Sequence, residues 1–118
     1  MSKAAYWQRG ETLDYVNNTG SIIEANTVIK LAERIGIAGT NINPGEKGDI
    51  HVCGVFEFAK TSQNKIEMGT SVYFDGEGIT ETAGDDTPAG FAAATAETAD
   101  NTILVKICLL YTSDAADE

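Results

Sequence analysis

The residues that could perform acid–base or metal chemistry are few and far apart in this sequence. His51 is the only histidine, and Cys53 follows it by two positions. Two residues at that spacing on one strand share a face. However, no second thiolate completes a metal site, and no third group orients a Cys–His dyad. We therefore interpret His51 as structural and Cys53 as a buried thiol of an apolar strand, rather than half of a disulfide with Cys108.

Two other segments resemble functional motifs in composition only. The glycine-rich stretch 36–48 lacks the Gly-x4-Gly-Lys-Ser/Thr order of a phosphate-binding loop, because Glu46 occupies the place of the lysine. The neighbouring acids Asp85 and Asp86 lie among glycine, threonine and proline, which is typical of a solvated loop. We therefore predict no catalytic residue, no cofactor, no metal ion and no small-molecule substrate, and we do not expect an enzyme.

The charge of the chain is strongly negative and unevenly distributed. Eighteen Asp and Glu oppose eight Lys and Arg, which gives a formal charge of −10. Such a surface repels a phosphate backbone, so no nucleic-acid partner is expected. Lys3 and Arg9 make the first ten residues basic, whereas no basic residue lies between Lys65 and Lys106. The pattern predicts a basic arm on an acidic body.

Length and hydropathy predict one modest domain. The chain has 118 residues and no run near the ~20 apolar residues that span a bilayer, so no membrane partner is expected. The first residues lack the apolar run of a secretion signal, which predicts synthesis in the cytoplasm. Residues 108–118 resemble the translation of a sequencing adapter, with a genuine acidic extension as the alternative. Without them, residues 1–107 keep a charge of −7.

Short bursts of β-branched and apolar residues alternate with clusters of Gly, Asn, Asp and Pro, a spacing typical of an all-β domain. In the Ala-rich stretch 89–99 no stripe of period 3.6 occurs, so a strand of small residues is favoured over a helix. No internal repeat is apparent. We predict an all-β fold, a compact small β-barrel or sandwich-like domain at 11–107 with an extended arm at 1–10. The predicted strands are 12–16, 27–32, 34–38, 48–58, 71–74, 79–82, 88–95 and 101–107.

Four local signals refine this prediction. Residues 17–20 (NNTG) can supply positive φ angles to a turn, and residues 43–46 (NPGE) fit a turn with Pro second and Gly third. Residues 75–78 (DGEG) between two apolar runs predict a hairpin. Gly54 interrupts the alternation of strand 48–58 and indicates a bulge or a close crossing.

Six segments in order resemble a known family. The resemblance, which covers about residues 5–107, lies in 10–15 (GETLDY), 34–38 (RIGIA), 54–60 (GVFEFAK), 69–75 (GTSVYFD), 88–92 (PAGFA) and 102–107 (TILVKI). They are similar to the small phage capsid cement, or decoration, proteins, a family long described as a domain of unknown function. The family is sometimes labelled recombinase-like. The acidic charge and the missing phosphate-binding loop do not support that label.

The resemblance implies a structural virion protein on the capsid exterior, commonly a homotrimer, that stabilises contacts between major capsid subunits. We hypothesise that Tyr6, Trp7 and Arg9 of the arm bind the capsid, since Tyr, Trp and Arg often dominate interfaces. The alternative is a frayed terminus with Trp7 packed on its own domain. A rival function is a free-standing sugar-binding module, but Tyr73 and Phe74, as strand neighbours, face opposite ways and form no joint platform.

Overall fold

The computed structural model describes residues 2–6 and 10–107 of the chain. Within these ranges every regular element is a strand, so the predicted all-β fold is confirmed. No helix there is long and apolar enough to cross a membrane. The strands are β1 (Thr12–Val16), β2 (Val28–Lys30), β3 (Ile35–Ala38), β4 (Lys47–His51), β5 (Val55–Ala59), β6 (Ser71–Phe74), β7 (Ile79–Thr80), β8 (Thr87–Ala92) and β9 (Thr102–Lys106).

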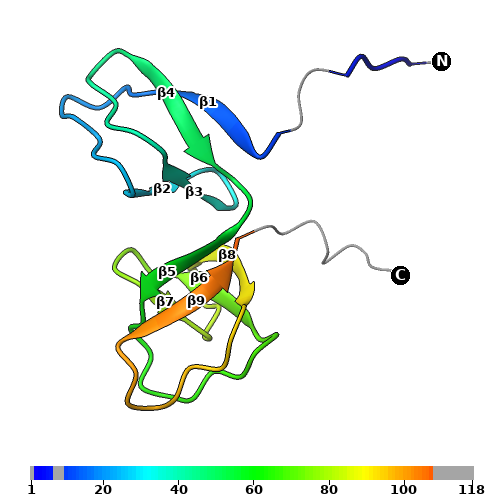
Figure 1. Cartoon of the computed structure of the whole chain (residues 1–118), viewed down its shortest axis with the longest axis vertical. Helices are drawn as coiled ribbons and strands as arrows, with labels where there is room; N and C mark the ends of the chain where they lie inside the picture. Colours follow the sequence, from blue (N-terminus) through cyan, green and yellow to red (C-terminus); the bar gives the residue numbers. More distant parts are fainter. Residues whose placement is uncertain (1, 7–9, 108–118) are drawn as a thin grey trace.

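The strands form two antiparallel sheets, one above the other in Figure 1. The first sheet has the order β1-β4-β3-β2, and the second has the order β5-β9-β8-β6-β7. A single parallel bridge between Lys60 and Ile79 brings β7 close to the end of β5. The arrangement is sandwich-like, and the predicted barrel does not close.

One predicted strand is wrong in an informative way. The expected strand 48–58 is two strands, because β4 ends at His51 and β5 begins at Val55 in the other sheet. Gly54 lies in the connection between these two strands. Its φ is 119°, a backbone angle that residues other than glycine rarely adopt. Its carbonyl oxygen accepts a hydrogen bond from the Ile107 amide at 3.0 Å. The irregularity predicted at Gly54 therefore marks the crossing from one sheet to the next.

The two sheets repeat one plan, a repeat that we did not predict from the sequence. We call residues 11–52 the first unit and residues 54–107 the second unit. Strands β1-β4-β3-β2 correspond in order to β5-β9-β8-β6, which leaves β7 unmatched. The loop bonds repeat as well: the mutual Ile23–Ile42 bridge returns as the Ile66–Ala96 bridge. Three further backbone bonds, each from an amide to a carbonyl oxygen, occur in both units. The bonds Thr27 to Glu24, Asn26 to Ala38 and Gly39 to Asp49 of the first unit match Thr70 to Glu67, Gly69 to Ala92 and Ala93 to Leu104 of the second.

A short sequence signal accompanies this repeat. Residues 23–29 (IEANTVI) and 66–72 (IEMGTSV) share Ile, Glu and Thr at the same three positions. Asn26, the only residue other than glycine with positive φ in the described ranges, matches Gly69, whose φ is also positive. The units differ mainly after these segments. The β2–β3 connection is 31–34, whereas the β6–β8 connection spans 75–86 and contains β7.

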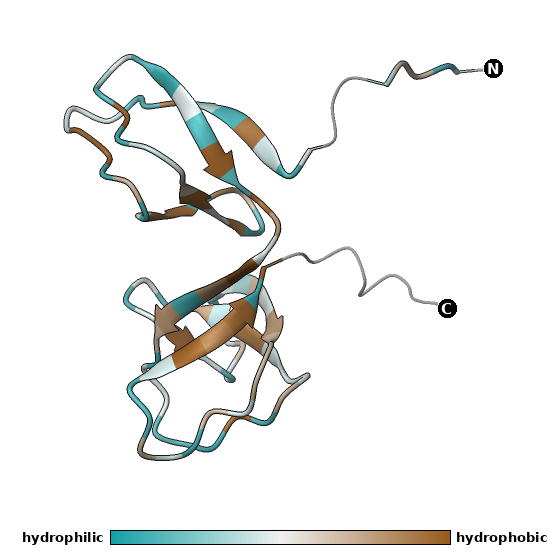
Figure 2. Cartoon of the chain, in the orientation of Figure 1, coloured by the Kyte–Doolittle hydropathy of each residue, from teal (hydrophilic) through white to brown (hydrophobic). Residues whose placement is uncertain are grey.

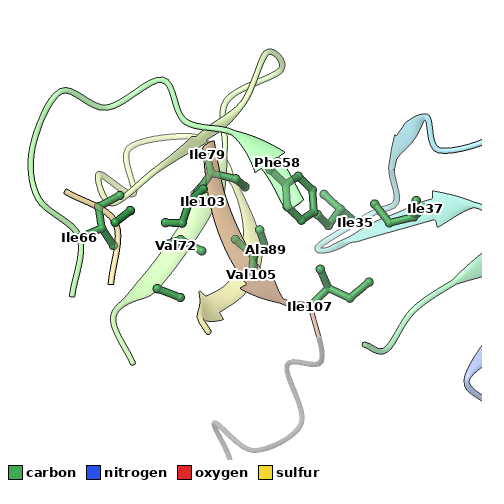
Figure 3. Packing of buried hydrophobic residues seen from close by; sticks show 12 residues of the cluster. Ile35, Ile37, Phe58, Ile66, Val72, Ile79, Ala89, Ile103, Val105 and Ile107 are labelled. Carbon is green, nitrogen blue, oxygen red and sulfur yellow. The ribbon is translucent and has the colours of Figure 1, made fainter. Parts of the chain in front are cut away.

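The main core belongs to the second unit but takes side chains from both. Ile35 and Ile37 of β3 extend from the first sheet to pack beside Phe58 of β5, as Figure 3 shows. The first unit keeps a smaller cluster of Ile29, Ala38 and Ile50. Figure 2 shows β9 mostly in the hydrophobic colour, whereas β1 and β4 of the first sheet carry hydrophilic and hydrophobic bands. Since the first unit has so few buried side chains of its own, its stability depends on the shared core.

Small residues in β8 allow the backbones of β8 and β9 to approach closely. Ala89 and Ala92 are fully buried. A Cβ placed on Gly90 would lie 2.0 Å from the carbonyl oxygen of Lys106 in β9. β8 ends at Ala92, earlier than predicted, and the chain then turns away toward Ala96.

The predicted turns are confirmed except the first. The Glu46 amide bonds the Asn43 carbonyl at 3.0 Å with φ of 82° at Gly45, and 75–78 joins β6 to β7 in a hairpin. Residues 17–20 show no positive φ. Instead, Asn17 is fully buried, and its side-chain amide donates to the carbonyl oxygens of Ser21 and Ile42, both at 2.8 Å. The loop is therefore held by a side chain and not by backbone conformation.

Candidate interaction surfaces

His51 packs against an aromatic ring and a glycine. This residue ends β4, and its ring lies 5.7 Å from the ring of Phe56 at a tilt of 47°. A Cβ on Gly39 would come within 3.2 Å of its Nε2 atom, so the imidazole packs over that glycine. Through its contact with Phe56, His51 links the end of the first unit to the start of the second.

Cys53 does not lie on the same strand as His51, contrary to the prediction. It sits in the connection between β4 and β5, where it is partly exposed instead of buried. Its suggested alternative partner, Cys108, lies outside the described residues. Within the ranges that the structure describes, no three His, Cys, Asp or Glu side chains are grouped so that they could hold a metal ion.

The glycine-rich stretch 36–48 is divided among three structural elements. Its start forms part of the buried strand β3, residues 43–46 form an exposed turn, and its end begins β4. Ile42 within it is buried at 1% exposure. The stretch therefore offers no loop of free amides to a phosphate group, and the interpretation as a turn is confirmed for 43–46.

Asp75 organises the hairpin between β6 and β7. Its carboxylate accepts a hydrogen bond from the Thr61 hydroxyl at 2.6 Å and bonds from the Glu77 and Gly78 amides, both at 2.9 Å. The Thr61 bond and then these amide bonds lower the pKa of the Asp75 carboxyl, against the opposing effect of partial desolvation. The charged form of Asp75 thus stabilises the folded hairpin.

We expect Asp75→Asn to lower stability at neutral pH but much less in acid. A pKa that is lower in the folded state than in the unfolded state adds stability above the unfolded value of about 3.9, and this gain is lost as pH falls through the folded pKa. Urea unfolding at pH 7 and pH 3 measures the effect, and Thr61→Val should reproduce part of it. An equal deficit of Asp75→Asn at both pH values contradicts this assignment.

Asp85 and Asp86 precede β8 at the rim of a small depression of about 120 Å³. Lys30, Phe74 and Asp75 also line it. Asp85 is exposed and Asp86 is partly exposed, as expected for a solvated loop. The pair belongs to an acidic border that continues along the hairpin between β6 and β7.

A larger groove of about 460 Å³ lies between the two units. Its apolar lining includes Val28 and Ile37 from the first unit and Phe56 and Phe74 from the second. Two acids, Glu57 and Glu77, contribute to the lining, and no basic residue does. This groove was not predicted, because its walls come from β2, β3, β5 and the β6–β7 hairpin, and only the packing of the units places them together.

Apolar residues are also exposed on the outer face of the second sheet. Val55 of β5 is 54% exposed and Leu104 of β9 is 41% exposed. Leu104 is paired with Glu57, and Val55 with Lys106. Side chains of paired residues share a face, so these four form a mixed apolar and charged surface on β5 and β9.

The arm predicted to bind a partner is only partly described. Residues 2–6 are exposed, and Tyr6 is 84% exposed. Trp7 and Arg9 lie outside the described residues. Tyr6 thus presents its ring to solvent, as an interface residue would, while the grouping of Tyr6, Trp7 and Arg9 stays a prediction.

The platform required by a sugar-binding module does not form at Tyr73 and Phe74. Phe74 packs on the main core and lines the groove between the units. Tyr73 is partly buried and precedes it on β6, so it faces the other side of the sheet.

Comparison with known protein families gives a match over most of the chain. The family model of the phage cement protein matches residues 7–107. Neither the curated proteins nor the solved structures compared include a match to the chain. The match covers both structural units and begins within the predicted arm.

Proposed function

Because this chain belongs to the phage cement protein family, a structural class of the phage virion, we propose that it binds the outer capsid surface and stabilises contacts between major capsid subunits. The family match across residues 7–107 is the observation that carries the proposal. Within the described residues, no group of three His, Cys, Asp or Glu side chains that could hold a metal ion supports a different function.

In our proposal the arm at 1–10 makes the first contact with the capsid. Tyr6 is 84% exposed in the described part of the arm. Aromatic residues and arginine contribute strongly to interfaces when they become buried in the complex. The basic residues Lys3 and Arg9 also suit an acidic surface on the capsid subunit.

Repeated binding on a symmetric shell lets modest single-site affinity suffice. A homotrimer attached at three points gains avidity without new kinds of contact, provided that all three copies reach their sites together. We propose such a trimer, with the domain at 11–107 as its body. Capsid subunits that are held together by a bound trimer then resist outward pressure better than subunits without it.

Removing residues 1–10 is expected to weaken binding to undecorated capsids at least tenfold, because it removes the aromatic and basic side chains at once. Cosedimentation of the full and shortened chains with shells measures this change. Light scattering of the unmixed samples gives the mass of the binding unit, for which we expect three chains.

Two variants sharpen this experiment. Simultaneous alanine substitution of Tyr6, Trp7 and Arg9 should reproduce the deletion, whereas Ser2→Ala should bind as the full chain does. Binding by the shortened chain at full strength would assign capsid attachment to the body instead of the arm. No binding by the full chain would refute the proposed function itself.

A further inference from the structure

The groove between the units is bordered by two edge strands. β5 has one neighbour in its sheet, β9, and β2 has one neighbour, β3. The groove lining includes Phe56 to Ala59 from the first of these strands and Val28 from the second. An edge strand directs half of its backbone amides and carbonyls away from its neighbour, where they can pair with another chain.

The register fixes which backbone groups of β5 point outward. The Lys60 amide bonds the Asn101 carbonyl, and the Ile107 amide bonds the Gly54 carbonyl. Pairing in an antiparallel ladder alternates, so Phe56 and Phe58 also bond β9. Val55, Glu57 and Ala59 therefore point their amides and carbonyls away from β9.

Their outward direction leads toward the groove. A Cβ built on Gly78 would lie 2.6 Å from the Ala59 carbonyl oxygen, so the outward side of β5 faces the β6–β7 hairpin. The Thr61 amide, just beyond β5, bonds the Ile79 carbonyl of this hairpin at 3.0 Å. β7 thus covers the far end of the β5 edge. Val55 and Glu57 lie before the covered end, and Glu57 lines the groove.

β2, on the opposite wall of the groove, also has backbone groups that point away from its neighbouring strand. The Ala38 amide bonds the Thr27 carbonyl, and the Leu31 amide bonds the Arg34 carbonyl. By the same alternation, Val28 directs its backbone groups away from β3. Since Val28 also lines the groove, edges from both units contribute to one channel.

The side chains that line the groove indicate which kind of ligand would bind there. Phe56 and Phe74 are half-buried and supply apolar surface. Glu57 and Glu77 are the charged residues of the lining, and both are exposed. An extended peptide with one large apolar side chain and at least one Lys or Arg complements this set.

We propose that the groove receives an extended basic segment of the major capsid protein as an added strand on β5. The amide and carbonyl of Glu57 pair with the backbone of the segment. An apolar side chain contacts Phe56 and Phe74, and a basic side chain lies between Glu57 and Glu77. This inference rests on the proposed function and specifies where the capsid contact is made by the body of the protein.

Substitutions at Glu57 separate the backbone contact from the side-chain contact. Glu57→Ala removes the charge but keeps the amide, whereas Glu57→Pro removes both. Proline is tolerated on edge strands where the lost amide faces outward, so the β5–β9 bonds remain. In cosedimentation with undecorated shells we expect Glu57→Pro to bind about fivefold more weakly than Glu57→Ala, the effect of one hydrogen bond.

Charge reversal provides a second test that does not alter the backbone. Glu57→Lys and Glu77→Lys should each weaken shell binding about tenfold at low salt, and less at high salt. Glu67→Lys, an equal change on an exposed loop outside the groove lining, should bind as the wild-type protein does. Thermal unfolding of each variant verifies that it is folded.

A photoreactive benzoylphenylalanine in place of Glu77 should crosslink to the capsid subunit, and the same group in place of Glu67 should not. Equal binding by Glu57→Pro and Glu57→Ala, with no crosslink at position 77, overturns the added strand while leaving capsid binding intact. Wild-type protein that fails to bind shells refutes the proposed function, and this inference with it.

Discussion

Gly90→Ala is expected to cost more than about 4 kcal/mol of folding stability, a loss large enough to unfold many small domains. The added Cβ would lie 2.0 Å from the Lys106 carbonyl oxygen and 3.0 Å from the Ile107 Cα atom. Both contacts are with backbone of or next to β9, which cannot rotate aside as a flexible side chain can. The φ of 129° at Gly90 adds conformational strain to this clash.

Gly76→Ala is the matched control for that experiment. Gly76 has a similar φ of 101°, but nothing lies within 4 Å of a Cβ built there. It should therefore show only the conformational cost, about 1–2 kcal/mol. Urea unfolding followed by circular dichroism compares the two variants. Equal losses in both would mean that the β8–β9 contact relaxes and that close approach is not essential.

Ile35→Ala is expected to destabilise both units by about 2–5 kcal/mol, although Ile35 belongs to the first sheet. Its side chain is 1% exposed and packs in the main core with Phe58 and Ile107 of the second unit. A single unfolding transition that moves as a whole is therefore expected. Ile22→Ala, at a site 46% exposed, should change stability little.

Hydrogen exchange can locate the effect of Ile35→Ala. Amides of β9, such as that of Val105, should lose protection in the variant if the two units unfold together. Protection lost in the first sheet alone would show that the shared core does not couple them. The stability of the first unit would then have to come from its own smaller cluster.

Local patterns predicted the elements well where one strand or turn carried its own signal. The strands at 12–16 and 71–74 were found with the observed ends, and 43–46 and 75–78 form the expected turns. The strand predicted at 48–58 failed because apolar residues continue through the connection between the sheets. Periodicity cannot distinguish one long strand from two that lie in different sheets.

Features formed by distant segments could not be predicted in this way. Asn17 was predicted to supply a positive φ angle to a turn. Instead, its side-chain amide donates a hydrogen bond to the Ile42 carbonyl oxygen, which comes close only after folding. The repeat was also missed, although 23–29 and 66–72 carry matching residues. The groove forms because Ile35 and Ile37 of the first unit pack in the core of the second. No local sequence signal indicates this packing.

The position of β9 sets an order on folding as the chain is synthesised. β4 lies between β1 and β3, so the first sheet is complete once residue 52 has left the ribosome. β9 lies between β5 and β8, and its residues are the last of the second sheet to be made. Until they emerge, the main core cannot close and Ile35 has no pocket to fill. A nascent chain therefore holds a first unit whose four strands are all present but whose Ile35 side chain stays uncovered until β9 emerges.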